Sequence, residues 1–281
     1  MSRTARITVL VENTAQGAGM LAEHGLAYWI EWDGQRVLVD TGQGGVLVGN
    51  AYKLGVPLRQ SDAIVLSHGH YDHTGGLAEV LRSRRPADVY LHPAALDAKY
   101  ARNKDGTGRE IGIPFPGRQA LRQHGHRVVE TESPTAVLDG LTVTGHVPRT
   151  TDFEDTGGPF FLDAACTKPD PLADDQSVFF ETDEGLVVVL GCAHSGVINT
   201  LRYIADLSGG KPILAVIGGM HLVGASPERV ARTIEAFRTL GVRVLAPCHC
   251  TGMAATVALW SAFPGRCVAC HVGARFEFGL K

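Results

Sequence analysis

Short apolar runs, separated by glycine, proline and charged residues, dominate the pattern of this chain. They predict strands over residues 7–11, 27–32, 37–40, 63–66 and 89–91, and again over 141–144, 177–181, 186–190, 213–217 and 242–246. Several runs are apolar without alternation, which is typical of strands covered on both faces. The pattern therefore predicts two groups of strands, early and late, in sheets whose faces are covered.

Helical periodicity follows one early strand and separates the late ones. Apolar residues recur at helical spacing over residues 75–84, 196–206 and 226–240. The last of these begins with Ser226 and Pro227, a capping residue followed by proline at the first helical position. Strands first, and then strands alternating with helices, predict an α/β sandwich with helices on the outside.

Two segments, 99–117 and 151–175, are rich in glycine, proline and charge, and they predict long loops. Long loops in compact enzymes commonly border the active site. Neither segment has the character of a linker, so residues 1–281 are expected to form a single domain. A last strand is expected over residues 266–272.

The composition argues against several classes of protein. The 281 residues are 44% hydrophobic and 20% charged, which suits a sizeable core. A net charge of −3 gives no electrostatic reason to expect binding to nucleic acid or to a membrane. No run approaches the roughly 20 apolar residues of a membrane span, and the N-terminus lacks the pattern of a signal peptide. The six cysteines lack the spacing of a secreted scaffold, which favours reduced thiols and a cytoplasmic location.

The most specific chemical signal is the run SHGHYDHTGG at residues 67–76. It places His68, His70, Asp72 and His73 within six residues, directly after a predicted strand. Neutral imidazole and carboxylate are preferred ligands of zinc and related divalent ions. This spacing allows one turn to supply two ligands to each of two neighbouring metals, so it predicts a metal site.

Further polar residues stand at predicted strand ends, where loops converge on one rim. His146, His194, His221 and His249 each follow a late apolar run. Each alone fits a capping or core histidine, but four at four strand ends indicate a shared site. Asp40 ends an early run, where it is expected either to form a turn or to hydrogen-bond a ligating imidazole and fix its tautomer.

The remaining histidines and the cysteines have simpler interpretations. His92, His124 and His126 fit ordinary surface positions or positions that support a ligand. Cysteine pairs at 248/250 and 267/270 have spacings that also occur in structural zinc sites. The first pair brackets a candidate ligand and the second falls in a predicted strand, so packing of free thiols is the favoured interpretation.

With these motifs, the chain resembles the metallo-β-lactamase fold superfamily, whose hallmark is His-x-His-x-Asp-His after a strand. It also resembles the subgroup named after 7,8-dihydropterin-6-yl-methyl-4-(β-D-ribofuranosyl)-aminobenzene-5′-phosphate synthase. The resemblance runs from Thr8 to about Gly279. The subgroup features fall at residues 23–26, 40–43, 67–77, 148–154, 174–176, 191–196, 218–222 and 248–252. The resemblance implies a four-layer αββα sandwich, the metallo-β-lactamase fold.

The resemblance also implies how the main ligands divide between two metals. His68 and His70 would hold the first metal, while Asp72 and His73 would hold the second. His249 stands in the place of the last superfamily ligand.

Three other positions depart from the superfamily pattern. Where members usually carry a bridging aspartate, this chain reads GCAH at residues 191–194, and we expect His194 to take that role, with Cys192 as the second choice. His146 falls where many members have a further histidine of the first metal. His221 has no standard counterpart and is expected either to contact substrate or to act as an unusual ligand.

The function that follows is a metal-dependent hydrolase acting on an ester, lactone or phosphoester of a small molecule. The implied cofactors are two divalent ions, with zinc expected and iron or manganese as alternatives. Asp72 would position the activated water and accept its proton, and Arg149 would either hold an anionic group of the substrate or be an exposed structural residue.

Three alternatives remain open at this point: synthase chemistry of the subgroup kind, a non-catalytic protein that binds a ligand through its metal centre, and a diiron oxidoreductase. Gly69 argues against the last, because such relatives carry a ligating glutamate at this position. The sequence sets neither the substrate nor the oligomeric state.

Overall fold

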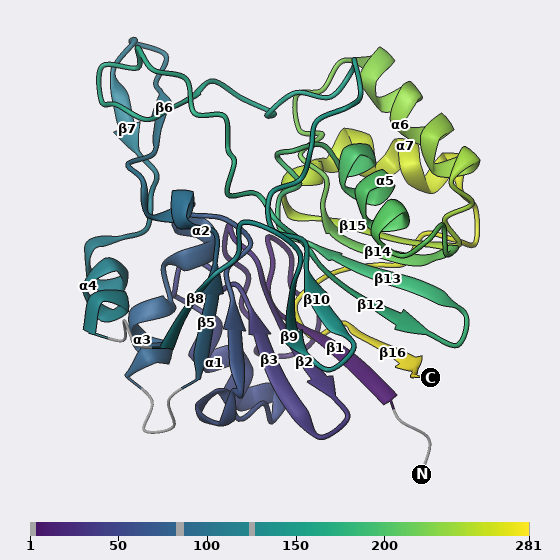
Figure 1. Cartoon of the computed structure of the whole chain (residues 1–281), viewed down its shortest axis with the longest axis horizontal. Coiled ribbons are helices and arrows are strands. Elements are labelled where there is room, and N and C mark those ends of the chain that lie inside the picture. Colours follow the sequence, from purple (N-terminus) through teal and green to yellow (C-terminus); the bar gives the residue numbers. More distant parts are fainter. Residues whose placement is uncertain (1–3, 83–86, 124–126, 281) are drawn as a thin grey trace.

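The computed structural model describes residues 4–82, 87–123 and 127–280, and its strands form two large sheets and one small sheet (Figure 1). In spatial order, the first sheet contains β16 (Arg275–Gly279), β1 (Thr4–Val11), β2 (Ala27–Trp32), β3 (Gln35–Val39), β4 (Ala63–Val65), β5 (Asp88–Leu91) and β8 (Val128–Glu130). The second contains β15 (Val244–Cys248), β14 (Ile213–Gly219), β13 (Gly185–Leu190), β12 (Val178–Thr182), β10 (Leu141–Val143) and β9 (Thr135–Leu138). The small sheet joins β11 (Phe160–Phe161), β6 (Tyr100–Arg102) and β7 (Gly108–Glu110).

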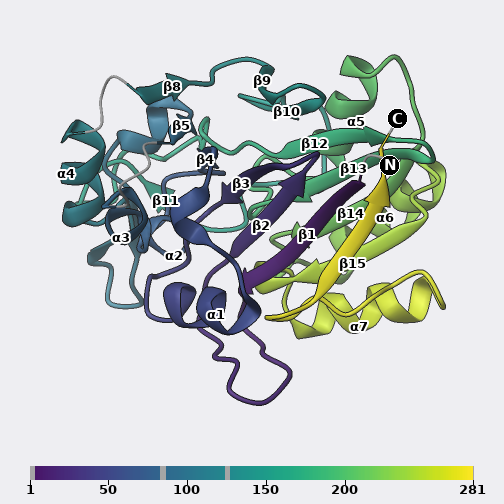
Figure 2. The ribbon, with the colours of Figure 1, turned by 90° about the horizontal axis from the view of Figure 1, so that it is seen from below.

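Helices cover the outer face of each large sheet (Figures 1 and 2). On the first sheet these are α1 (Leu47–Leu54), α3 (Leu77–Leu81) and α4 (Phe115–Gln123), and the short α2 (Tyr71–Thr74) lies at its edge. On the second they are α5 (Val197–Leu207), α6 (Pro227–Thr239) and α7 (Met253–Ala262). Short 3₁₀ turns occur at Leu58–Gln60, Pro93–Leu96 and His249–Thr251. The predicted αββα sandwich is therefore confirmed.

Three apolar cores hold these layers together, and β13 shows how one strand serves two of them. Val187 and Val189 face the core between the two sheets, whereas Val188 and Leu190 face the core beneath α5, α6 and α7. Successive side chains of a strand point to opposite faces, so a strand that lies between two cores must be apolar throughout. Burial of each such side chain contributes about 1.5–3 kcal/mol.

Most predicted strands form close to the expected bounds, but three segments differ, one of them residues 151–175, which were expected to be a loop and contain β11. Residues 99–117, expected to be a loop, contain β6, β7 and the beginning of α4. These short strands are polar and pair with each other as a hairpin, so the sequence has no apolar run that would predict them. The strand expected over 266–272 does not form, because that segment makes two isolated bridges, from Cys267 to Leu245 and from Val272 to Ala15, rather than a continuous ladder. The last strand is instead β16, which pairs with β1.

The direction of the strands decides where their following loops meet. β3 and β4 run parallel, and β13, β14 and β15 run parallel in the facing sheet. Parallel strands end at the same edge, so the loops after all five strands gather at one end of the sandwich. No helix in the described part of the chain is long and apolar enough to cross a membrane.

Candidate metal centre

The candidate ligands occupy this end of the sandwich, each just after a strand. His68, His70, Asp72 and His73 follow β4, the last two within α2. The loop after β13 carries Cys192 and His194, the loop after β14 carries His221, and the turn after β15 carries His249. Both sheets therefore contribute to one cluster.

Several of these loops adopt a backbone conformation that side chains other than glycine rarely take. Asp40, Ala193, His221 and His249 have φ values of 59°, 55°, 43° and 50°. They are four of the seven non-glycine residues with positive φ in the described chain. Left-handed backbone costs energy outside glycine and tends to be retained at functional sites. Its concentration here marks these strand ends as a site.

One buried carboxylate orients two of the imidazoles. Asp40 accepts hydrogen bonds from the amide and the hydroxyl of Ser67, both at 2.7 Å, and from Nδ1 of His73 at 2.7 Å. The Ser67 hydroxyl donates its only proton to Asp40, so it accepts from Nδ1 of His68, which lies 2.9 Å away. Both imidazoles are thus protonated on Nδ1 and present Nε2 to the cluster, the arrangement that orients histidine ligands of metals.

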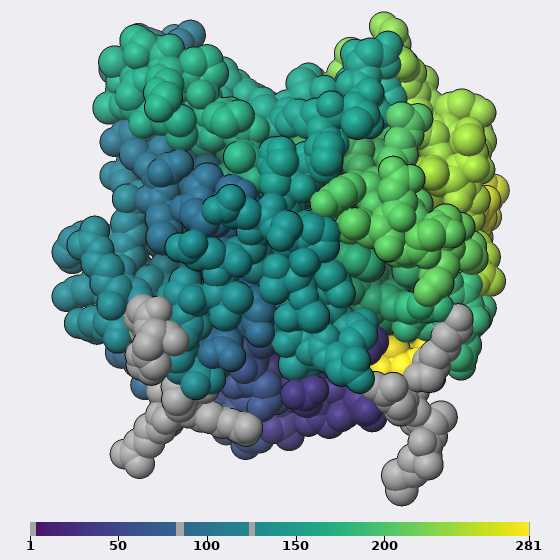
Figure 3. Space-filling view, in the orientation of Figure 1, coloured from purple at the N-terminus to yellow at the C-terminus, as the bar shows by residue number. Residues whose placement is uncertain are grey.

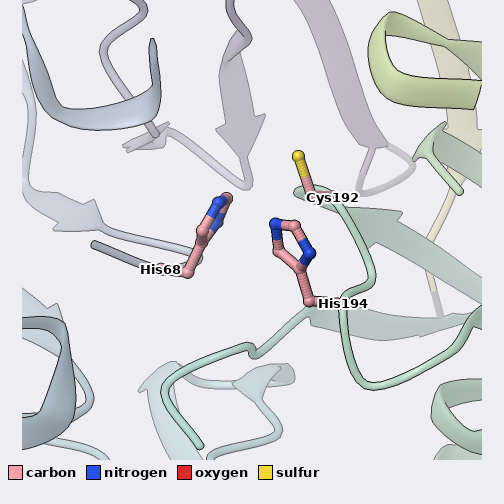
Figure 4. Close-up of side chains that lie close together, drawn as sticks. All are labelled: His68, Cys192 and His194. Carbon is pink, nitrogen blue, oxygen red and sulfur yellow. The ribbon is translucent and has the colours of Figure 1, made fainter. Parts of the chain in front are cut away.

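His68, His70 and His194 form the first ligand group. Nε2 of His68 lies 3.0 Å from Nδ1 of His70. His194 donates from Nδ1 to the carbonyl of Thr156 at 2.8 Å, which leaves its buried Nε2 without a hydrogen-bond partner in the described chain. The rings of His68 and His194 lie edge to face, with centroids 4.9 Å apart, and Figure 4 shows the two side chains pointing toward each other with Cys192 nearby.

These three imidazoles are neutral at physiological pH. Burial lowers the pKa of His68 and of His194 well below the ordinary value. It also lowers the pKa of His70 to about 3. Neutral imidazoles gathered in one buried cluster, each with a lone pair to give, are suited to share a cation.

Asp72, His73 and His249 form the second ligand group. Nε2 of His73 lies 3.3 Å from Nε2 of His249, and one oxygen of Asp72 lies 3.8 Å and 3.4 Å from these two atoms. Asn13 receives a hydrogen bond from Nδ1 of His249 at 2.8 Å, so Nε2 of that ring is also directed inward. His24 reaches the same Asp72 oxygen at 3.2 Å.

Charges in this second group depend on one another. Burial acts to raise the pKa of Asp72, but the positive charge of His73 and hydrogen bonds from His24 and His249 outweigh it and lower that pKa well below its ordinary value. Burial acts to lower the pKa of His73, yet Asp40 and Asp72 together raise it to about 9. Without a metal, the second group thus holds a carboxylate and a protonated imidazole.

Cys192 lies between the two groups. Its sulfur is 3.1 Å from Nε2 of His73, and it falls within 4.8 Å of ligand atoms of both groups. The sequence led us to expect His194 rather than Cys192 at a bridging position. His194 has its Nδ1 held by the carbonyl of Thr156, and it is the Cys192 sulfur that lies within 4.8 Å of the ligand atoms of His73 and His249.

His221 lies beside the first group. Its ring centroid is 4.2 Å from that of His194, and its Nδ1 has no hydrogen-bond partner in the described chain. Together with Cys192 and Cys250 it forms a third set of ligand atoms that all lie within 4.8 Å of one another.

Two other predicted residues lie elsewhere. His146 is exposed, with Nδ1 3.1 Å from the carbonyl of Ala173 and its ring 6.4 Å from that of His92. Arg149 is exposed and donates to the carbonyl of Pro171. The structure therefore gives neither residue a place in the centre. His92 caps the turn at Pro93–Leu96, and residues 124–126 lie outside the described chain.

Sequence reasoning missed Asn13, His24 and Glu12, the last of which accepts a hydrogen bond from the amide of His249 at 2.7 Å. Glu12 and Asn13 directly follow β1, which runs parallel to β3 because both are antiparallel to β2. Applying the strand-end argument to β1 would have found them. His24 follows no strand, and only its place in the motif at residues 23–26 pointed to it.

Three consecutive residues, Asp174, Asp175 and Gln176, hold the two main ligand loops together. Asp174 accepts from the amide of Gly69, in the loop of His68 and His70, at 2.8 Å. Asp175 accepts from the amide of Ser195, in the loop of Cys192 and His194, at 2.8 Å. Gln176 donates to the carbonyl of Leu66 at 2.8 Å.

A buried cation supports this segment. Nζ of Lys99 lies 2.9 Å from Asp174 and 2.9 Å from Asp170, and all three side chains are buried. Asp175 has no such cation beside it in the described chain, and burial raises its pKa to about 6. The position of Gly69 is equally constrained, because a Cβ there would lie 2.3 Å from the carbonyl of Ala95.

The ligand groups form the floor of a cavity of about 760 Å³. One side is the arm that carries β6, β7 and β11, with Arg109 and Phe160 facing the cavity, and the other side includes Met253 and Trp260 of α7. The molecular surface is notched between this arm and the C-terminal helices (Figure 3). The chain thus offers a cluster of metal ligands at the base of a cavity that is large enough for a small molecule.

Comparison with known proteins places this geometry in context. Residues 21–249 match the family model of the metallo-beta-lactamase superfamily. An uncharacterized protein of Methanocaldococcus jannaschii is 34% identical, with 90% of this chain and 93% of that protein covered. The 7,8-dihydropterin-6-methyl-4-(beta-D-ribofuranosyl)-aminobenzene-5'-phosphate synthase of the same organism is 28% identical, with 92% and 90% covered.

Solved structures agree with these matches. A metal-dependent hydrolase of the beta-lactamase superfamily superposes with a TM-score of 0.81 at 32% identity, covering 98% of this chain and 99% of its own. Zn(2+)-bound PqqB from Methylobacterium extorquens superposes with a TM-score of 0.54 at 15% identity, covering 96% and 99%. At that identity the second likeness concerns the fold alone.

Proposed function

The chain belongs to the metallo-beta-lactamase superfamily, and from this premise we propose that it is a metal-dependent hydrolase of a small-molecule ester, lactone or phosphoester. The proposed cofactors are two divalent ions, with zinc expected and iron or manganese as alternatives. His68, His70 and His194 would hold one ion, and Asp72, His73 and His249 the other.

The donor set fits such ions. Nε2 of His194 is buried and without a hydrogen-bond partner in the described chain, while its Nδ1 is held by Thr156. An orphaned imidazole nitrogen in a buried cluster is costly unless a cation or a proton satisfies it. The observation that carries the proposal is the position of Cys192, whose sulfur is close to both ligand groups at once.

When bound, divalent ions at these groups lower the pKa of a water and polarise the bond under attack. The residues of the chain supply the rest. The lowered pKa of Asp72 keeps its carboxylate ionised at neutral pH, so it can orient the attacking water and accept its proton. His24 is half-exposed and lies 3.2 Å from Asp72, and its hydrogen bond to that carboxylate raises its pKa, so it is placed to pass the proton to solvent.

Metal analysis combined with an activity screen tests this proposal. The purified protein would be analysed for metal content, stripped with a chelator, and assayed against ester, lactone and phosphodiester panels before and after metal is restored. Activity is expected to disappear on stripping and to return with metal. His146→Ala, outside the centre, serves as a control beside His73→Ala. Metal-stripped protein that keeps full activity would rule the mechanism out.

A second candidate is synthase chemistry of the kind named for the Methanocaldococcus jannaschii relative. The 28% identity over 92% of this chain favours it, although the more similar relative at 34% has no assigned activity. Quenching of pterin fluorescence on titration with protein tests this candidate. Absence of binding at millimolar pterin would count against it.

A further inference from the structure

Helix α7 departs from the usual pattern of a surface helix, because it is apolar on both faces. One face of the helix packs into the core beneath the second sheet through Ala255 and Leu259. Phe263, the residue that follows the helix, is buried in the same core. On the outer side, Met253 is 75% exposed and Trp260 is 44% exposed. A surface helix normally turns polar residues outward, so this second apolar face requires an explanation.

The outer face of α7 borders the same cavity as the metal ligands. Met253 and Trp260 both line that cavity, and they are joined there by Val223, which is 56% exposed. We refer to Val223, Met253 and Trp260 as the α7 wall. The amide of Val223 donates to the carbonyl of Cys250, next to His249, so the wall is anchored to the turn that carries a candidate ligand. The wall therefore continues the candidate active site rather than forming a separate surface.

The arm across the cavity has a different character. Among the described residues that line the cavity, Arg109 is the only lysine or arginine. Its guanidinium lies 5.9 Å from the ring of Tyr71, and no carboxylate of the described chain forms an ion pair with it. The amide of Tyr71 donates to the carbonyl of Ile111 at 2.9 Å, which ties the arm to the residue preceding Asp72. An arginine stacked near an aromatic ring and lacking a carboxylate is available to bind an anion.

We infer that the substrate is an organic anion with an extended apolar group, which lies along the α7 wall while its negative group faces Arg109. This inference rests on the proposed function, because it places the bond to be cleaved between these two sides, above the ligand groups. A purely polar substrate would leave the α7 wall in water, and a neutral one would leave Arg109 unused.

Two fluorescent probes with related ring systems test the inference by binding alone. Anilinonaphthalene sulfonate carries a negative charge and phenylnaphthylamine does not. In metal-loaded protein, Trp260→Ala is expected to raise the dissociation constants of both probes about tenfold, because a large apolar contact is lost. Arg109→Ala is expected to raise only that of the sulfonate, by about fivefold, in the range of an exposed ion pair.

Matched variants and a size measurement complete the experiment. Val257→Ala, on α7 but outside the cavity, and Lys104→Ala, at the exposed tip of the hairpin, are expected to leave both constants unchanged. Equal weakening of both probes by Arg109→Ala would overturn the anion subsite. If Trp260→Ala leaves the binding of both probes unchanged, the apolar subsite is overturned. If, in addition, the wild-type protein sediments as a dimer and Trp260→Ala as a monomer, the α7 wall is an interface between copies of the chain. Since neither probe is turned over, these outcomes are independent of whether the protein is a hydrolase.

Discussion

The floor and the rim of the cavity are built in opposite ways. On the floor, His73 is fully buried and its outer nitrogen is held by Asp40, and His249 is held in the same manner by Asn13. At the rim, Met253 and Trp260 are exposed apolar side chains on a helix surface. A floor of this kind fixes where chemistry takes place, whereas a rim of this kind selects what enters. Changes on the floor should therefore affect metal binding, and changes at the rim should affect only substrate affinity.

The largest effect is expected from Cys192→Ala. Because the Cys192 sulfur lies near both ligand groups, its loss should lower the metal content of both and reduce kcat/KM by about 10³-fold, the scale of losing a group that acts in the transition state. Metal analysis and steady-state kinetics measure both effects. Cys267→Ser, a buried thiol in the core beneath α5, α6 and α7, is the control. A Cys192→Ala protein that keeps its full metal content would show that Cys192 is not a ligand shared by the two groups.

Next comes Lys99→Met, which tests the support beneath the floor. The substitution leaves Asp170 and Asp174 buried without their cation, and removal of one partner from a buried ion pair costs about 3 kcal/mol or more. Denaturant unfolding of metal-free protein should show this loss in the free energy of unfolding. Lys104→Met, at the exposed tip of the hairpin, should change it by less than about 0.5 kcal/mol. Similar stabilities for the two variants would mean that Lys99 does not hold the ligand loops.

The layers of the fold could be predicted from the sequence, because each strand that lies between two cores must be apolar throughout. Residues 186–190 were predicted as a strand, and β13 is found at Gly185–Leu190. The hairpin of β6 and β7 could not be predicted from the sequence, because its strands are stabilised by pairing with each other and with β11 rather than by apolar burial. Helix α7 was missed because a helix that is apolar on both faces has no helical period in its hydrophobicity.

Most of the residues that meet at the site could also be predicted from the sequence. Polar residues after parallel strands must meet, and this argument gathers His194, His221 and His249 beside the histidines that follow β4. The same argument wrongly included His146, which follows the short strand β10 of the second sheet. The side chain of His146 is directed instead toward the carbonyl of Ala173. Whether His194 or Cys192 faces both groups depends on the left-handed turn at Ala193, and strand ends alone do not encode that turn. The ligand roles themselves stay predictions until metal is measured.

A third, smaller effect concerns protons on the floor. Since Asp40 and Asp72 raise the pKa of His73 to about 9, metal binding near pH 7.5 should release a proton from this ring. Affinity should then rise by about tenfold for each pH unit up to about 9. Calorimetric titration of metal into stripped protein, in buffers of different ionisation enthalpy, counts the protons released.

The same shift has a defined sign for stability. The folded pKa of His73 lies above the unfolded value, so the pair with Asp40 stabilises metal-free protein below about pH 6.5 and this contribution is lost as the pH rises through about 9. Asp40→Asn should lower the pKa of His73, and it should therefore weaken the pH dependence of both metal affinity and stability. Proton release that is unchanged in Asp40→Asn would assign the protons to another group.

The smallest effects are expected at the rim, within a single helix. Met253→Ala should raise KM for an apolar substrate about threefold, through lost apolar contact, and leave both kcat and metal content unchanged. Its free energy of unfolding should change by less than about 0.5 kcal/mol, because the side chain is 75% exposed. Leu259→Ala, on the buried face of the same helix, should cost about 2–5 kcal/mol while leaving KM unaltered. If Met253→Ala proves as destabilising as Leu259→Ala, the outer face of α7 contributes to folding, and its apolar character needs no substrate to explain it.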